Sequence, residues 1–307
     1  MTVFPPVPSL RQRLRRACRL QGGRSDMHRL ATVILLTVLA AGCATVPPPP
    51  ELRLQQPVVL LGEVHDNAVQ HALRLQAFEA LLASGARPAL VMEQFDRERQ
   101  GVIDALRAQS PPADADALIA AAGGAGWEWR FYRPFVALAL EHGLPIVAAN
   151  VSRADARQVM ATGLQAHGFD ADVAPDLLQA LAADIEDSHC GLIDDATARR
   201  MALAQVARDQ SMAAAVDRHA GRGVLLLAGN GHVRTDAGVP RWLDPATRAQ
   251  SEAIGLLEEG ARKRGRYDRV VLTAAQERKD PCEGMRRPAA GPAVNPATSS
   301  PGPTPAR

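Results

Sequence analysis

The 307-residue chain lacks three features that would mark common functional classes. It has no long stripe of basic residues interleaved with aromatic ones, although RQRLRRACR near the N-terminus is densely basic. With a formal net charge of +2, this gives no support for binding nucleic acid. It has no apolar run of the roughly 20 residues that a membrane-spanning helix needs. It has only two tyrosines, so chemistry that depends on a phenol has few candidates.

The N-terminal region has the pattern of a bacterial export signal. Met27, a second candidate start besides Met1, opens a short positive stretch followed by the apolar run LATVILLTVLAA. A run of about 12 residues suits a secretory signal rather than a membrane span. The string Leu39-Ala40-Ala41-Gly42-Cys43 resembles the lipobox, in which the cysteine is lipidated and becomes the mature N-terminus. A plain signal peptide with an incidental cysteine is the alternative.

These signals divide the chain into four parts. We expect a leader and lipoprotein signal peptide over residues 1–42, a lipidated proline-rich spacer over 43–55, one α/β domain over 56–282 and a disordered tail over 283–307. The tail is rich in Pro, Ala, Gly, Ser and Thr and cannot bury enough apolar surface to order itself. Because Ala44 rather than Asp follows the cysteine, the resemblance to sorted lipoproteins favours the outer membrane, facing the periplasm.

Two of the four cysteines remain for the domain. Cys18 lies in the leader and Cys43 carries the lipid, which leaves Cys190 and Cys282. In an oxidising compartment such a pair predicts a disulfide. Two free thiols are one alternative, and a metal site that combines Cys190 with His189 is another.

Six apolar segments alternate with helical patterns along the domain. They are PVVLLGEV, RPALVMEQF, LPIVAANV, GVLLLAGNGH, SEAIGLLEE and YDRVVLTAA. Uninterrupted apolar runs of this length are typical of strands buried on both faces of a parallel sheet. We therefore predict an α/β fold, with a mainly parallel central sheet flanked by helices, in a single domain with helical insertions.

The helical patterns make three further predictions. Helical spacing gives the helix after the first strand a buried face made of Val69, Leu73, Gln76, Ala77, Ala80 and Leu81. The stretch WEWRFYRPFVALALEHG predicts a helix that is interrupted or begins near Pro134. A long helix that ends at Gly221 carries a stripe that either faces a site or is a solvated ion-pair ladder. This stripe consists of Gln205, Arg208, Asp209 and Met212.

Two matching motifs follow predicted strands. Gly62-Glu63-Val64-His65 and Gly229-Asn230-Gly231-His232 each place a Gly three residues before a His, directly after an apolar run. Each His therefore lies at the carboxyl end of a parallel strand, where ligands bind in open α/β sheets. Glu93 and Asn150 end two other strands. Imidazoles bind metals or transfer protons, and carboxylates orient them or activate water. We therefore expect one site formed by Glu63, His65, Glu93 and His232.

The same stretches admit structural interpretations. In GEVHDN, Gly62 would allow close packing while Asp66 or Asn67 caps the next helix. The turn around Asn230 could bind an anion, with Arg234 just beyond it. Tyr132 belongs to the aromatic cluster WEWRFYRPF, which forms either a corner of the core or an apolar wall for a large flat ligand with a phenol for iron.

Taken in order, the motifs resemble those of the ChaN-like haem-binding lipoproteins. After the lipobox they are LLGEVHDN, VMEQFDR, WEWRFYRPF, LPIVAAN, HCG, AQVARDQSMA and LAGNGHVRTDAGVPRWL. The resemblance implies an α/β domain that binds haem, as a pair of haems between two copies in a homodimer, for haem and iron uptake with an outer-membrane receptor. It also implies a tyrosine ligand to iron, assisted by a histidine. We expect Tyr132 as that ligand, with further cofactor contacts from His65, His232 and Arg234.

The family in turn is similar to the Tiki proteases, which share the paired Gly-x-x-His motifs, and distantly to the erythromycin esterases. This similarity raises the alternative of a hydrolase that depends on a divalent metal ion and uses the four strand-end residues. An inert envelope scaffold is a third interpretation. The resemblance favours a binding protein without turnover over an enzyme.

Replacement of Cys43 tests the anchor. The change Cys43→Ala removes the sulfur that would carry the lipid, so the domain should move from the membrane fraction to the soluble fraction. Fractionation of cells that express the wild type and the variant measures this. A variant that still sediments fully with membranes would show that Cys43 is not the anchor.

Overall fold

The computed structural model describes residues 52–261, 265–280 and 282–283. The predicted leader, the lipidation site Cys43, most of the spacer and nearly all of the tail lie outside these residues. Among the residues described, no helix combines the length and the apolar character needed to cross a membrane.

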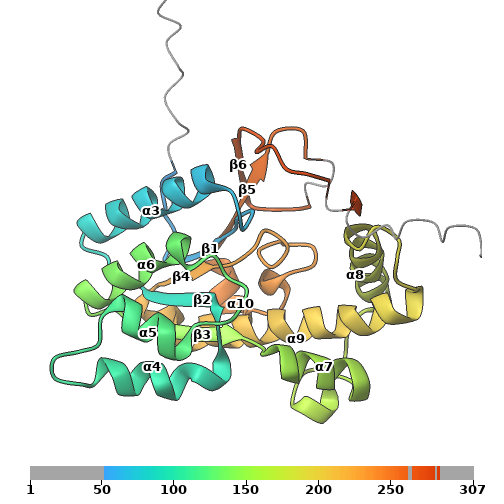
Figure 1. Cartoon of the computed structure of the whole chain (residues 1–307), viewed down its shortest axis with the longest axis horizontal. Coiled ribbons are helices and arrows are strands. Elements are labelled where there is room, and N and C mark those ends of the chain that lie inside the picture. Colours follow the sequence, from blue (N-terminus) through green and yellow to red (C-terminus); the bar gives the residue numbers. More distant parts are fainter. Residues whose placement is uncertain (1–51, 262–264, 281, 284–307) are drawn as a thin grey trace, which may run out of the picture. The chain divides into compact units, whose positions relative to one another are not determined.

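A six-stranded sheet with all strands parallel forms the centre of the domain (Figure 1). The strands are β1 (Val58–Leu61), β2 (Ala89–Asp96), β3 (Ile146–Asn150), β4 (Val224–Leu227), β5 (Ser251–Glu258) and β6 (Arg269–Thr273). Their order in the sheet is β3-β2-β4-β1-β5-β6. This confirms the predicted parallel α/β fold. The carboxyl ends of β1 and β4, which precede the two Gly-x-x-His motifs, are therefore neighbours.

Helices connect most of the strands and cover both faces of the sheet (Figure 1). They are α3 (Ala68–Ala83), α4 (Gln100–Arg107), α5 (Ala115–Ala122), α6 (Trp129–Glu141), α7 (Arg153–Thr162), α8 (Pro175–Ser188), α9 (Asp195–His219) and α10 (Pro245–Ala249). On one face Leu61 belongs to a buried cluster with Phe78 and Phe135. On the other, Leu60 belongs to a cluster with Met212 and Val216 of α9. Since both faces are covered, the central strands β1 and β4 carry a buried apolar residue at every position.

Helix α3 buries Leu73 and Ala77 as its apolar spacing predicts, but the rest of its buried face differs from the prediction. Val69 is 51% exposed, and Gln76 and Ala80 are also exposed. The buried face instead includes three polar residues, namely Gln70, His71 and Arg74. The helix is rotated because these polar side chains have partners beneath it, described below.

Helix α6 also differs from its sequence pattern. It begins at Trp129 and continues through Pro134 to Glu141 without interruption. This path buries Tyr132 and Phe135 against α3 and the sheet.

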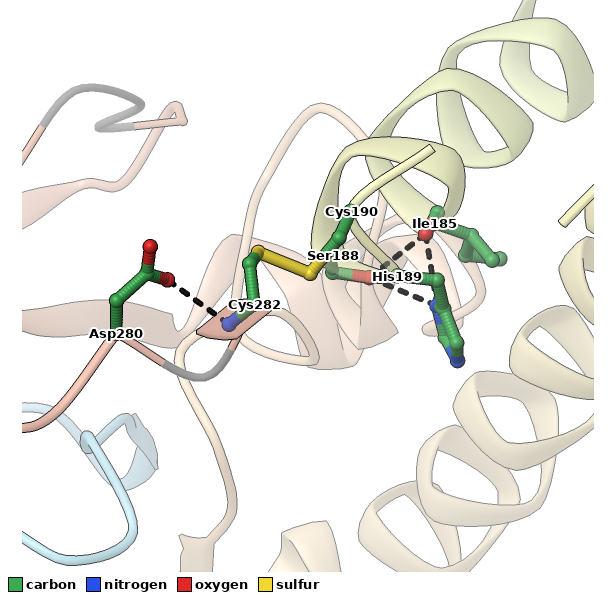
Figure 2. The surroundings of a disulfide bond; sticks show 6 residues. All are labelled: Ile185, Ser188, His189, Cys190, Asp280 and Cys282. Carbon is green, nitrogen blue, oxygen red and sulfur yellow. Dashed lines mark hydrogen bonds between the residues drawn. A yellow bond between two sulfur atoms is a disulfide. The ribbon is translucent and has the colours of Figure 1, made fainter. Parts of the chain in front are cut away.

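A disulfide joins Cys190 to Cys282, 92 residues apart, with Cα atoms separated by 5.7 Å. Cys190 follows the last turn of α8, and Cys282 lies in the C-terminal segment after β6 (Figure 2). The bond agrees with the predicted pairing, and a cysteine engaged in it has no thiolate to offer a metal ion.

Two substitutions on α3 test which face is buried. Phe78 is fully buried, with its ring centroid 6.0 Å from that of Phe135. Phe78→Ala should therefore lower the free energy of unfolding by about 3–5 kcal/mol. Val69→Ala, on the face predicted from spacing alone, should change it by no more than about 0.5 kcal/mol. Urea unfolding measures both, and equal losses would contradict the observed rotation of α3.

Candidate functional site

The two Gly-x-x-His motifs lock together at the carboxyl edge of the sheet. The Asn230 N–H donates to the Glu63 carbonyl at 2.9 Å. The Asn230 side chain bridges to β5, donating to the Leu256 carbonyl at 2.5 Å and accepting from the Leu256 N–H at 3.0 Å. Gly62 must be glycine, because a Cβ there would lie 2.7 Å from Val233 Cγ2. Asn230 thus joins the segment after β1 to strand β5 through hydrogen bonds to both.

Glu63 is the centre of one buried polar cluster. Its side chain is fully buried and forms an ion pair with Arg74, which is also fully buried. Its carboxylate accepts hydrogen bonds from the Tyr132 hydroxyl and from His65 Nδ1, the latter at 2.9 Å. His71 Nδ1 lies 3.4 Å from the same carboxylate. A buried carboxylate is tolerated only with such partners.

The partners of Glu63 are electrostatically suited to it. Burial lowers the pKa of Arg74 to about 10, which still leaves the guanidinium charged at neutral pH. Burial raises the pKa of the Tyr132 phenol well above its ordinary value, so this group keeps its proton and donates a hydrogen bond to Glu63. His71 is fixed by its Nε2, which donates to the His65 carbonyl at 2.9 Å.

His232 is the centre of a second buried cluster. Its Nδ1 lies 2.5 Å from Asp209 Oδ1, and its Nε2 lies 3.4 Å from Glu93 Oε1. The Gln205 amide nitrogen lies 3.1 Å from His232 Nε2. Burial disfavours a charged imidazole, but the charges of Glu93 and Asp209 raise the pKa of His232 to about 10. The ring is therefore an imidazolium held between two carboxylates.

The two carboxylates respond differently to the same ring. Burial opposes ionisation of both. For Glu93 the charge of His232, with hydrogen bonds from His232 and the Gly229 N–H, lowers the pKa to about 2. For Asp209 burial prevails over His232 and raises the pKa to about 6. At neutral pH, Glu93 is thus the more firmly ionised partner.

Gly229 brings the two clusters into contact. Its N–H donates to Glu93 Oε2 at 2.7 Å. A Cβ on this residue would lie 2.7 Å from His65 Cε1, so the His65 ring packs directly over the glycine. The His65 side chain is 50% exposed, whereas that of His232 is 8% exposed. His65 is therefore a solvent-accessible member of these clusters. Its ring makes an edge contact with Trp127, with 4.9 Å between the ring centroids.

A cavity of about 610 Å³ lies beside these motifs, within the range of small-molecule sites. Its lining comes from the two motifs, the end of α8, the end of β5 and the segment before β6. The residues are Val64, Asp184, Asp187, Ser188, Asn230, Gly231, Arg234, Leu257, Glu258, Ala261, Gly265 and Tyr267.

Two lining residues carry chemistry. Arg234 donates to Asp184 at 2.7 Å and to Asp236 at 2.8 Å, which fixes its guanidinium in the cavity wall. Tyr267 packs against Gly255, where a Cβ would lie 2.8 Å from its ring. Burial raises the pKa of Tyr267 to about 12, against a lowering by the charge of Arg234.

The structure gathers Glu63, His65, Glu93 and His232 at one edge of the sheet. It also turns Gln205 and Asp209 of α9 towards His232, which was one of the two interpretations of that stripe. Met212 instead lies in the core. Asn150 only caps its own strand, accepting from the Val151 N–H at 2.9 Å. Asn67 caps the N-terminus of α3, and its side chain accepts from the Gln70 N–H.

Sequence reasoning missed the contribution of α3. Gln70, His71 and Arg74 all face the site, and their one available signal was that polar residues recur one helical turn apart. It also placed Tyr132 as an iron ligand. The structure buries Tyr132 completely and engages its hydroxyl with Glu63, so iron would reach this oxygen only if that hydrogen bond were broken. The ligand role of Tyr132 stays a prediction.

The described ranges contain no group of three or more His, Cys, Asp or Glu side chains placed to hold a metal ion. Both ring nitrogens of His232 face protein groups, which leaves neither open to a metal.

The protein is thus an all-parallel α/β domain with paired histidine–carboxylate clusters at its strand ends. The chain belongs to the family described as haem-binding uptake, Tiki superfamily, ChaN, whose model matches residues 52–243. The structure of ChaN of Campylobacter jejuni, described by its cofacial haem binding, is 21% identical. The match covers 70% of this chain and 86% of that one, with a TM-score of 0.60. It supports the fold.

More remote similarity extends to a mutant of an erythromycin esterase in its open conformation. That structure is 13% identical, with 67% of this chain and 71% of that chain covered and a TM-score of 0.38. No curated relative matches this chain.

The protonation state of His232 is testable. Because its pKa is raised, its charge should stabilise the fold fully below about pH 6.5 and lose this effect as the pH rises towards 10. Imidazole NMR should show a doubly protonated ring at pH 8. Asp209→Asn removes one of the two carboxylates and should lower the pKa of His232. Asp195→Asn, exposed at the start of α9, is the matched control. A wild-type ring that is neutral at pH 7 would contradict this.

Proposed function

We propose that this protein is a lipid-anchored haem-binding protein of the outer membrane that serves haem and iron uptake. The observation that carries the proposal is membership in a haem-binding family over residues 52–243. The lipobox-like string that ends at Cys43 supports the location.

A phenol in its wall favours the cavity as the haem site; this is Tyr267, whose hydroxyl donates a long hydrogen bond of 3.4 Å to the Asn230 carbonyl. A tyrosine is one of the axial ligands that proteins offer to haem iron. The chain has two tyrosines. Tyr132 is fully buried and bound to Glu63, whereas Tyr267 lines the cavity. We therefore assign the ligand role to Tyr267, which lies beyond the stretch that the family model matches.

The remaining contacts follow from the chemistry of the cavity. Arg234 is a fixed cation in its wall and suits the carboxylates of haem. His65, one residue from the lining residue Val64, is a half-exposed imidazole that can assist as the second polar group. Its Nδ1 donates to Glu63, so Nε2 carries the lone pair. When bound, haem would supply a redox-active iron, and these residues would hold and orient it.

A divalent-metal hydrolase is less well supported. The strand-end residues do converge, but their carboxylates and imidazoles are engaged with one another. Such mutual pairing builds a rigid edge rather than an open coordination site.

A haem titration with two tyrosine variants tests the proposal. The wild type should show a saturable Soret band with ferric haem. Tyr267→Phe removes the ligand oxygen but keeps the ring, so it should weaken binding and shift the spectrum. Tyr132→Phe should leave the spectrum unchanged and lower the stability by about 1.5–3 kcal/mol, since it removes a hydrogen bond to a charged group.

The outcomes separate the assignments. A shifted spectrum in Tyr132→Phe alone would return the ligand role to Tyr132. An absence of saturable binding in the wild type would reject haem as the ligand.

A further inference from the structure

The segment after β6 forms a strap, which we define as residues 274–280 together with Cys282. All residues from 274 to 280 are exposed. Between β6 and Cys282 the strap is attached to the domain mainly through Arg278. This side chain donates to Asp66 at 2.6 Å and to Glu258 at 2.7 Å. The guanidinium donates two hydrogen bonds to each of these carboxylates, so the strap is attached by this ion-pair network and, covalently, by the bond at Cys282.

The strap connects two walls of the cavity. One wall contains Glu258 at the end of β5, which Arg278 holds. The other contains Asp187 and Ser188 at the end of α8, which His189 separates from Cys190. Figure 2 shows the bond between Cys282 and the residue that follows this last turn of α8. The strap and its disulfide thus link the β5 wall to the α8 wall, and we call this link the tie.

The last turn of α8 is more exposed than the first half of the helix. The first half of α8 is anchored by buried Leu177 and Leu181, which pack with residues of α9. In contrast, Asp187 and Ser188 in the last turn are exposed. Cys190 itself has a φ of 61°, in the left-handed region that L-residues other than glycine seldom adopt. The Cys190 N–H donates to the Asp187 carbonyl at 3.1 Å and the Gly191 N–H to the Glu186 carbonyl at 2.9 Å, so the disulfide joins a capped helix end to the strap.

We propose that the Cys190–Cys282 disulfide is a redox-controlled tie across the cavity, and that its reduction by a dithiol lets the end of α8 and the strap separate and speeds ligand release. The inference rests on the proposed function in taking haem as the ligand of this cavity. The ion pair of Arg234 with Asp184 remains after reduction, so the walls loosen without unfolding of the domain.

The chemistry of the switch is ordinary thiol–disulfide exchange. A thiolate of the dithiol attacks one sulfur of the pair and forms a mixed disulfide, while the other cysteine leaves as a thiolate. The second thiol of the reductant then displaces the bound cysteine. Two electrons and two protons pass to Cys190 and Cys282, and the reductant becomes a disulfide.

The test compares the oxidised full chain, the same protein reduced with dithiothreitol, and the double variant Cys190→Ser/Cys282→Ser. Hydrogen exchange follows the end of α8, the strap, and β1 with β4 as internal reference. Reduction should speed exchange in the first two regions and leave the central strands slow. Transfer of haem to excess apomyoglobin should become on the order of tenfold faster. The double variant should behave as the reduced protein in either buffer.

Arg278→Gln is the matched control, because it weakens the strap but keeps the disulfide. Its haem release should stay close to that of the oxidised wild type. Equal exchange, or equal haem release, in oxidised and reduced protein would overturn the tie. If the oxidised wild type takes up no haem, the proposed function fails. Faster exchange at both ends on reduction would then still support the tie, and unchanged exchange would overturn it.

Discussion

The buried charge of Glu63 is the interaction on which the site depends. A carboxylate at the end of a central strand cannot remain ionised in the core without a counter-ion and hydrogen-bond donors. Arg74 supplies the charge, while Tyr132 and His65 donate hydrogen bonds. These partners come from α3, α6 and the turn after β1. One carboxylate therefore determines which face of α3 is buried, where α6 packs, and how the solvent-accessible imidazole of His65 is oriented.

The sheet could be predicted because its cause is local. Strands covered on both faces need an apolar residue at every position, and this pattern is visible in PVVLL and GVLLLA without knowledge of neighbours. The same logic placed His65 and His232 at the carboxyl edge, since a motif after a parallel strand has only one edge to occupy. The strand order was not predictable in this way, because it depends on pairing between segments far apart in the chain.

The polar face of α3 could not be predicted for the opposite reason. Spacing places apolar residues inwards, and Arg74 is fully buried only because Glu63 lies beneath it. The accessibility of a side chain also depends on partners that are distant in the sequence. Composition shows that the chain has two tyrosines, but only packing decides that Tyr132 is sealed under α3 while Tyr267 lines a cavity. Partners that are distant in sequence leave no periodic trace.

The strand order also governs when the domain can form. β1 pairs with β4 and β5, and β2 pairs with β3 and β4, so the first two strands never pair with each other. The gap between them is filled only by Val224–Leu227. A chain growing from its N-terminus cannot close this sheet until most of the domain has been synthesised. Since pairing of distant segments slows folding, the domain assembles late and as one unit, with β4 as the last piece of its centre.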